Sequence, residues 1–147
     1  VFFDTNGNFL NQVTVGALPD AITITNNGRY AVVANEGEPN GAYTVDPEGS
    51  VSVIDLSGGP MSATVATAGF GAFNAAPPPG VRLPRPFGAT VAQDLEPEFV
   101  ATSHDSRTAW VTLQENNALA IVDLPSATVT DVVGIVAFLG LATLLLG

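Results

Sequence analysis

The sequence predicts an all-β protein of short antiparallel strands, and three observations support this fold class. The 147 residues are 46% hydrophobic and 12% charged, and the 15 Gly and 11 Pro favour strands and turns over a helical bundle. Short runs of alternating apolar and polar residues are separated by turn residues. One pattern of four such runs occurs twice, which is typical of a β-propeller blade. We therefore expect a partial β-propeller of about two and a half four-stranded antiparallel blades with an apolar C-terminal tail. A sandwich of about ten antiparallel strands is the alternative.

The first expected element is a half blade over residues 1–15. Its sequence, VFFDTNGNFLNQVTVG, resembles the segments SVIDLSGGPMSATVATAG and AIVDLPSATVTDVVGIV. The alignment makes Asp4, Asp55 and Asp123 equivalent, each at the end of an alternating strand and before a turn. A short carboxylate in this position accepts backbone N–H bonds, so we expect these three residues to stabilise turns.

Two full blades are expected over residues 21–69 and 99–133. The segment DAITITNNGRYAVVANEG matches EFVATSHDSRTAWVTLQE at an offset of 78 residues, and SVSVIDLSGG matches ALAIVDLPSA at an offset of 68. The first copy therefore carries ten extra residues, which fall between Glu38 and Glu48. Trp110, on the second strand of the later blade, is interpreted as core packing between blades.

The connector over residues 70–97 lacks strand periodicity. Its prolines, including the run 77–79, predict an extended loop resembling polyproline. Arg82 and Arg85 lie together in this loop; solvated side chains are the favoured interpretation, and an anion site is the alternative.

The apolar tail is assigned to residues 134–147, within an uncharged run that starts at Val132. A membrane-spanning helix needs about 20 residues, so this run is slightly short. A truncated membrane anchor, the removable tail of a lipid-anchoring signal, and a buried strand and helix of a larger fold remain open. The absence of an initiator Met and of a basic leader favours a mature or truncated piece.

The charge of the chain excludes some classes of partner. The net charge is −10, with 14 acidic residues against four Arg, so the basic patch of a nucleic-acid-binding protein is missing. An anionic surface favours cations or basic partners. Because the chain has no Cys, disulfides and thiol chemistry are also excluded.

Acidic residues gather in the segments that leave or enter strands at one end of the predicted blades. Oxygen ligands on loops suit Ca²⁺, so we expect a possible Ca²⁺ site assembled from separate loops, since the spacing does not fit an EF-hand. Solvated acidic loops that prevent edge pairing are the alternative. The candidate metal ligands are Glu36, Glu38, Asp46, Glu48, Asp94, Glu96 and Glu98.

Several phrases resemble the choice-of-anchor I family, which comprises large, surface-exposed, β-propeller-like proteins of bacteria. They are VTVGALPD, VVANEGEPN, YTVDPEGSVSVIDLSGG, VAQDLEPEFVA and TAWVTLQENNALAIVDL, and the resemblance covers residues 13 to about 131. The related domain of the mesenchyme-specific cell-surface glycoprotein of echinoderms is also similar. The resemblance implies an extracellular or cell-surface location. It implies as partners further blades of the same protein or neighbouring copies, with membrane or cell-wall anchoring through the tail.

Three functions follow from these observations. The first is a surface, adhesion or assembly role with Ca²⁺ on the acidic loops, which requires no catalysis. The second is a metal-dependent phosphoester hydrolase, because members of the family are described as alkaline phosphatase-like or phytase-like. Against it, His104 is the chain's one histidine and lies in a turn, opposite the acidic loops by strand count. The third is a subunit of a multi-chain extracellular fibre, joined by strand addition.

Overall fold

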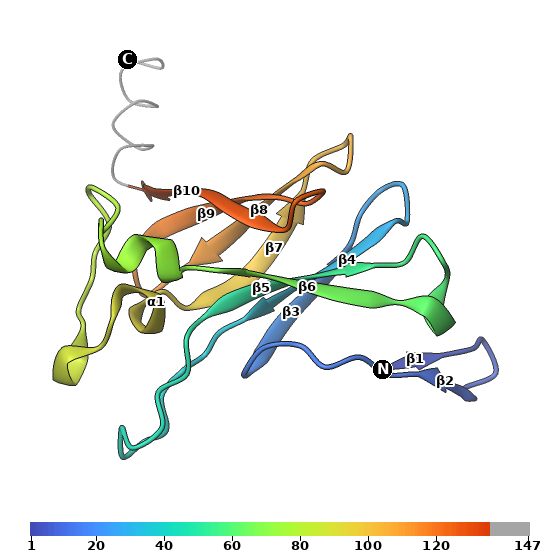
Figure 1. Ribbon diagram of the computed structural model, residues 1–147, viewed down its shortest axis with the longest axis horizontal. Coiled ribbons are helices and arrows are strands. Elements are labelled where there is room, and N and C mark those ends of the chain that lie inside the picture. The colour runs from blue at the N-terminus through green and yellow to red at the C-terminus, as the bar shows by residue number, and fades with distance from the viewer. Residues whose placement is uncertain (136–147) are drawn as a thin grey trace.

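The computed structural model describes residues 1–135 and confirms the all-β class (Figure 1). Ten strands form three antiparallel sheets, accompanied in this part of the chain by a single one-turn α-helix. The sheets of the described residues do not close into a ring. Residues 136–147 of the predicted apolar tail lie outside the described residues. Within residues 1–135, no helix is both long enough and apolar enough to cross a membrane.

The sheets coincide with the copies of the repeat. An N-terminal hairpin pairs β1 (Phe2–Phe3) with β2 (Phe9–Asn11). Each of the two larger sheets is a four-stranded meander, in which neighbours in sequence are neighbours in space. The first sheet contains β3 (Pro19–Ile24), β4 (Tyr30–Asn35), β5 (Ser50–Asp55) and β6 (Thr64–Gly69). The second sheet contains β7 (Pro97–Thr102), β8 (Thr108–Leu113), β9 (Ala118–Asp123) and β10 (Thr128–Gly134).

Strand register confirms the two repeat offsets. Ile22 pairs with Val33 in the first sheet, and Val100 pairs with Val111 in the second, each 78 residues later. On the next strand, Ser52 opposes Val33 and Ala120 opposes Val111. The β4–β5 connection covers residues 36–49, whereas β8–β9 covers 114–117, so the extra residues lie in the first connection.

The main core lies between the two larger sheets, where β3 and β4 pack against β7. Val32 and Val53 of the first sheet and Val111 and Val122 of the second are at most 3% exposed. Phe70, just after β6, is fully buried in the same core. A smaller cluster on the far face of the first sheet joins Ala31, Val33 and Ile54 to the N-terminal segment through Phe2, Val13 and Val15.

Equivalent residues of the two larger sheets face opposite ways. Val32 is fully buried towards the second sheet, but its equivalent Trp110 is 41% exposed on the face turned away from the first sheet. Conversely, Ile22 is 65% exposed and its equivalent Val100 is 2% exposed. The sheets are therefore related head to tail. The prediction that Trp110 packs between blades is wrong for these two sheets, because side chains alternate along β8 and Val111 takes the inward position.

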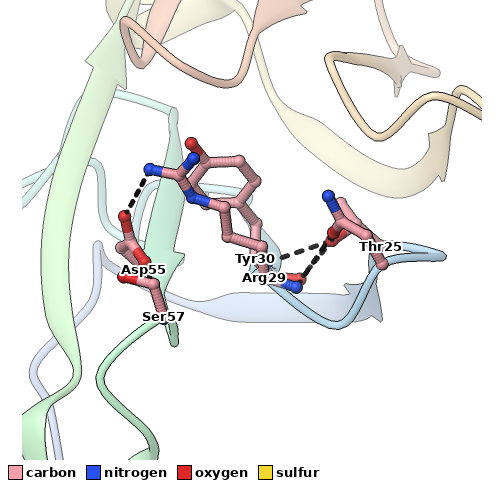
Figure 2. Close-up of polar contacts among 6 residues, drawn as sticks. Thr25, Arg29, Tyr30, Asp55 and Ser57 are labelled. Carbon is pink, nitrogen blue, oxygen red and sulfur yellow. Dashed lines mark hydrogen bonds and ion pairs between the residues drawn. The ribbon is translucent and has the colours of Figure 1, made fainter.

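The three equivalent aspartates stabilise turns, as predicted. Asp4 Oδ1 accepts N–H bonds from Asn6 and Asn8 at 2.9 and 2.8 Å. Asp55 Oδ1 accepts the Ser57 N–H at 2.8 Å, and Asp55 Oδ2 also lies 3.2 Å from Arg29 (Figure 2). Asp123 Oδ2 accepts the Ser126 N–H at 3.0 Å. Hydrogen bonds to each carboxylate lower its pKa.

The connector is more folded than predicted. Instead of one continuous extended loop, it contains the 3₁₀ turns η2 (Gly71–Asn74) and η3 (Pro86–Gly88) and the helix α1 (Val91–Asp94). A further 3₁₀ turn, η1 (Pro60–Ser62), lies outside the connector, between β5 and β6. Thr90 and Gln93 form a capping box at the start of α1, with Gln93 N–H donating to Thr90 Oγ1 at 3.2 Å. The Thr-x-x-Gln spacing carries this signal in the sequence.

Candidate functional site

An acidic recess lies at the end of the two sheets where β4 and β8 end. It is a cavity of about 350 Å³ between the β4–β5 loop, the connector and the β8–β9 turn. In Figure 1 the β4–β5 loop and the connector extend from the same side of the molecule, away from the β3–β4 and β7–β8 turns. Five carboxylates line the acidic recess: Glu36, Glu38, Asp94, Glu96 and Glu115.

Contacts between the β4–β5 loop and α1 build one wall of the recess. Gly49 N–H donates to the Ala92 carbonyl at 3.0 Å, and Gln93 Nε2 donates to the Asp46 carbonyl at 2.8 Å. A Cβ atom on Gly49 would collide with the Leu95 carbonyl oxygen, so only glycine permits this approach. The insertion predicted from the repeat is therefore fixed against the entry to the second sheet.

Asn116, which the sequence reasoning did not single out, holds the other wall. It is fully buried, and its Nδ2 donates to the carbonyl of Asp94 at 2.8 Å and to that of Arg82 at 3.0 Å. Arg82 in turn donates from Nη1 to the Glu115 carbonyl at 2.7 Å. Arg82 thus binds backbone in the β8–β9 turn, and the connector is tied to this turn from both sides.

Three carboxyl groups of the recess, those of Glu36, Asp94 and Glu96, have a raised pKa. Burial, together with the charges of Glu36 and Glu115, raises the pKa of Glu96 to about 7. Burial followed by the charge of Glu38 raises the pKa of Glu36. Burial also raises the pKa of Asp94, although its Oδ1 accepts the Arg85 N–H at 2.6 Å. The ion pair found among the described residues joins Arg29 to Asp55, outside the recess. The charges of Arg85 and Arg82 lower the pKa of Asp94 without forming an ion pair with it.

The seven predicted ligands are brought together only in part. Glu36, Glu38, Asp94 and Glu96 line the acidic recess. Asp46 lies in an adjoining cavity of about 40 Å³ that shares Asp94 and Glu96 with it. Glu98 lines a separate depression beside Asp20, where burial raises its pKa, and Glu48 is exposed and lines none of these cavities.

Glu115 joins the recess although the sequence reasoning did not include it. It follows Gln114 in the four-residue connection between β8 and β9. The repeat offset places Gln114 opposite Glu36, at the exit of the equivalent strand. The repeat alignment already contained Glu115 but paired it with Gly37, which has no carboxylate, so the alignment gave no signal for this position.

The candidate ligands have the oxygen atoms that a hard cation prefers, but the side chains are not close enough together to coordinate one. All candidate donors are carboxylate oxygens, which Ca²⁺ prefers, and Asp46 Oδ1 is buried without a hydrogen-bond partner. Among residues 1–135, however, no three acidic or histidine side chains are close enough to hold a metal ion as they stand. Side chains on the β4–β5 loop would therefore have to turn inwards to complete a site.

His104 lies in the β7–β8 turn, away from the recess. Its Nδ1 is 3.2 Å from Asn26 Nδ2 of the β3–β4 turn, and Ser106 Oγ accepts the Asn27 N–H at 3.2 Å. These contacts join the two turns at the end of the sheets opposite Glu36. The histidine thus has a structural neighbour, and the acidic groups are beyond its reach.

Comparison with known proteins identifies the family. The family model of the choice-of-anchor I domain matches residues 1–140. No curated protein sequence matches the chain significantly. The matched residues include all ten strands, both walls of the acidic recess and the connector. The chain belongs to the choice-of-anchor I family.

Proposed function

We propose that the chain forms blades of a β-propeller in an extracellular, surface-anchored protein. The family is anchor-related, which supports a cell-surface location. The head-to-tail relation of the two larger sheets carries the architectural part of the proposal. In a propeller each blade presents one face to the blade before it and the other face to the blade after it. A sandwich closed by two-fold packing would instead bury the same face of both sheets.

Further blades of the same protein, or neighbouring copies, would complete the ring. The outer faces of both sheets are apolar, with Ile22 and Ile24 exposed on the first and Phe99 and Trp110 on the second. Exposed apolar faces of this kind bind other protein surfaces, so they suit a structural and adhesive role, which requires no catalysis.

Surface location is tested on intact cells of the source organism. An antibody raised against the chain should label unpermeabilised cells, and external protease should remove the epitope while a cytoplasmic marker survives. Labelling only after permeabilisation would contradict the proposal.

We propose that the acidic recess binds Ca²⁺ as part of this role. Its carboxylates lie together with no basic side chain paired to them, and burial with mutual repulsion raises the pKa of Glu36 and Glu96. A divalent cation would relieve that repulsion and give the buried Asp46 Oδ1 a partner. The β4–β5 loop would close over the ion.

Thermal unfolding with added Ca²⁺ tests this site. Millimolar Ca²⁺ should raise the Tm of the wild type by several degrees. At saturating ion, binding to the folded state should add about 1–3 kcal/mol to the free energy of unfolding. Glu96→Gln should remove the shift, and Glu48→Gln, outside the recess, should retain it. An equal shift in all three proteins, or none in the wild type, would contradict the site.

The phosphoester hydrolase alternative has no observation in its favour. The recess has carboxylates but lacks a histidine among the described residues, because His104 occupies the opposite end of the sheets. A phosphatase would need an activated nucleophile or a metal-bound water there. The surface role therefore remains the proposal.

A further inference from the structure

Three Asn-Gly dipeptides occur in the chain, beginning at Asn6, Asn27 and Asn40. In an Asn-Gly dipeptide the backbone nitrogen of the glycine can attack the side-chain amide of the asparagine, because glycine has no side chain to block the approach. The attack forms a succinimide ring and leads to deamidation. Which of the three dipeptides can react depends on the fold, because the glycine nitrogen must be free and the asparagine carbonyl must be activated.

In two of the dipeptides the glycine nitrogen is held by a hydrogen bond. Gly7 N–H donates to the Asp4 carbonyl at 3.0 Å, and Gly28 N–H donates to the Thr25 carbonyl at 2.8 Å. Both glycines have a positive φ, 83° for Gly7 and 70° for Gly28, which is typical of tight turns. Each N–H group has to leave its carbonyl before the nitrogen can act as a nucleophile, so these turns protect their asparagines.

In the third dipeptide the glycine nitrogen is free. Among residues 1–135, Gly41 N–H donates to no backbone or side-chain acceptor. Gly41 is exposed, and a Cβ atom placed there would meet nothing within 4 Å. It belongs to the β4–β5 loop, which projects beyond the ends of the strands (Figure 1). Its nitrogen is therefore open to the solvent base that removes its proton.

The side-chain carbonyl of Asn40 is also activated. Thr44 N–H donates to Asn40 Oδ1 at 2.9 Å, and Val45 N–H donates to the same oxygen at 3.4 Å. Negative charge develops on this oxygen when a nitrogen adds to Cγ, and the two N–H groups stabilise it as an oxyanion hole does. Thr44 Oγ1 lies 2.9 Å from Nδ2, the group that leaves. We propose that Asn40 is a self-modification site, at which the amide is converted to a carboxylate.

The reaction is intramolecular and needs only water as a co-reactant. The Gly41 nitrogen bonds to Asn40 Cγ and loses its proton to solvent. The Cγ–Nδ2 bond then breaks, and Nδ2 takes a proton from solvent and leaves as ammonia. Water opens the resulting succinimide at one of its two carbonyls, which gives either aspartate or isoaspartate. The net change replaces one amide by one carboxylate, and nothing is oxidised or reduced.

The product adds a negative charge to the acidic recess. Asn40 lines the recess together with Glu36 and Glu38. Conversion changes the net charge of the chain from −10 to −11 and adds one carboxylate to the five already there. The recess therefore becomes more acidic as the protein ages. This modification goes beyond the proposed Ca²⁺ site and does not depend on it, since the reaction requires no metal ion.

Peptide mapping by mass spectrometry measures the conversion in the folded chain at mildly alkaline pH. The Asn40 peptide should convert roughly fivefold faster than the Asn27 peptide, since release of one backbone hydrogen bond corresponds to about that factor. In concentrated urea the two rates should become equal, because unfolding frees both glycine nitrogens. No conversion at Asn40, or equal rates in the folded chain, would overturn the inference. A difference that persists in urea would also overturn it, because the local sequence and not the fold would then be the cause.

Two variants in the exposed loop test the nucleophile and the leaving group. Gly41→Ala puts a Cβ atom beside the attacking nitrogen, so conversion of Asn40 should slow severalfold. Asn40→Gln keeps an amide but moves it one methylene further from the nitrogen, so the ammonia released by the wild type at this position should be lost. Because both positions are exposed, both variants should keep the far-UV circular dichroism of the wild type. Wild-type rates of ammonia release from both variants would overturn the inference.

Discussion

At the scale of single residues, the carboxyl groups fall into two sets with opposite electrostatics. Asp4, Asp55, Asp105 and Asp123 sit in exposed turns, where hydrogen bonds lower each pKa. In the recess, burial and the charges of neighbouring carboxylates raise the pKa of Glu36, Asp94 and Glu96. The change in the free energy of unfolding with pH near neutrality should therefore come from the recess, because the pKa values of the turn aspartates lie below their ordinary range.

Glu96→Gln should stabilise the protein at alkaline pH. The pKa of Glu96 is about 7 in the fold against an ordinary value of 4.5, so the folded state binds more protons between these values. Stability contributed by this group is present below about pH 4.5 and is lost as the pH rises through 7. With allowance for solvent screening, the variant should gain about 1 kcal/mol at pH 8 and nothing at pH 4.

Urea unfolding of wild type and variant at pH 4, 6 and 8 measures this difference. Glu48→Gln makes the same chemical change at an exposed position of the β4–β5 loop outside the recess, and should leave the pH profile unaltered. A Glu96→Gln protein that loses stability between pH 6 and 8 as steeply as the wild type would contradict the assignment.

Sequence reasoning at this scale succeeded where the interaction is local. The turn role of Asp55 could be predicted because its acceptor and the Ser57 donor are two residues apart. The role of Asn116 could not be predicted, because its partners Asp94 and Arg82 are 22 and 34 residues away in the sequence. The amide gains its role only when the connector folds over the β8–β9 turn.

At the scale of elements, alternation predicted the strands and missed the helix. The alternating pattern of β8 has a period of two that is visible in six residues. The helix α1 has one turn, too short to show a period, and the prolines around it suggested extended chain. Its stability comes from the Thr90 cap and from the β4–β5 loop, which meets it at Gly49.

Gly49→Ala should therefore destabilise the β4–β5 loop and the recess together. The added Cβ would meet the Leu95 carbonyl and also Pro97 Cδ at 2.7 Å, and a backbone oxygen cannot rotate away. Overpacking of this kind costs about 1–3 kcal/mol. Urea unfolding measures the loss, and limited proteolysis should cut the loop faster.

Gly41→Ala is the matched control for this change. Gly41 lies in the same loop, and a Cβ atom there would meet nothing within 4 Å. Its stability should stay within about 0.5 kcal/mol of the wild type. Equal effects of the two substitutions would mean that loop flexibility, and not the contact with Leu95, sets the stability.

At the scale of the whole molecule, the repeat predicted two four-stranded sheets but not which face each one buries. Alternation assigns Val32 and Ala31 to opposite faces without saying which face meets the second sheet. That choice depends on packing between β3, β4 and β7, which are far apart in the sequence. For this reason the prediction that Trp110 packs between blades is wrong for the two larger sheets, where Trp110 lies on the outer face of the second sheet.

One core shared by both larger sheets should make the described part of the chain unfold cooperatively. Val32→Ala in the first sheet removes buried volume at a fully buried position, which should cost about 2 kcal/mol. Trp110, the chain's one Trp, reports on the second sheet through its fluorescence. Because the core joins the sheets, the fluorescence transition should shift to lower urea by the same amount as the far-UV circular dichroism.

Val45→Ala, the same change at a 60% exposed loop position, should leave both transitions unmoved. A Trp110 transition that stays at the wild-type midpoint while the circular dichroism splits in two would mean that each sheet is stable alone.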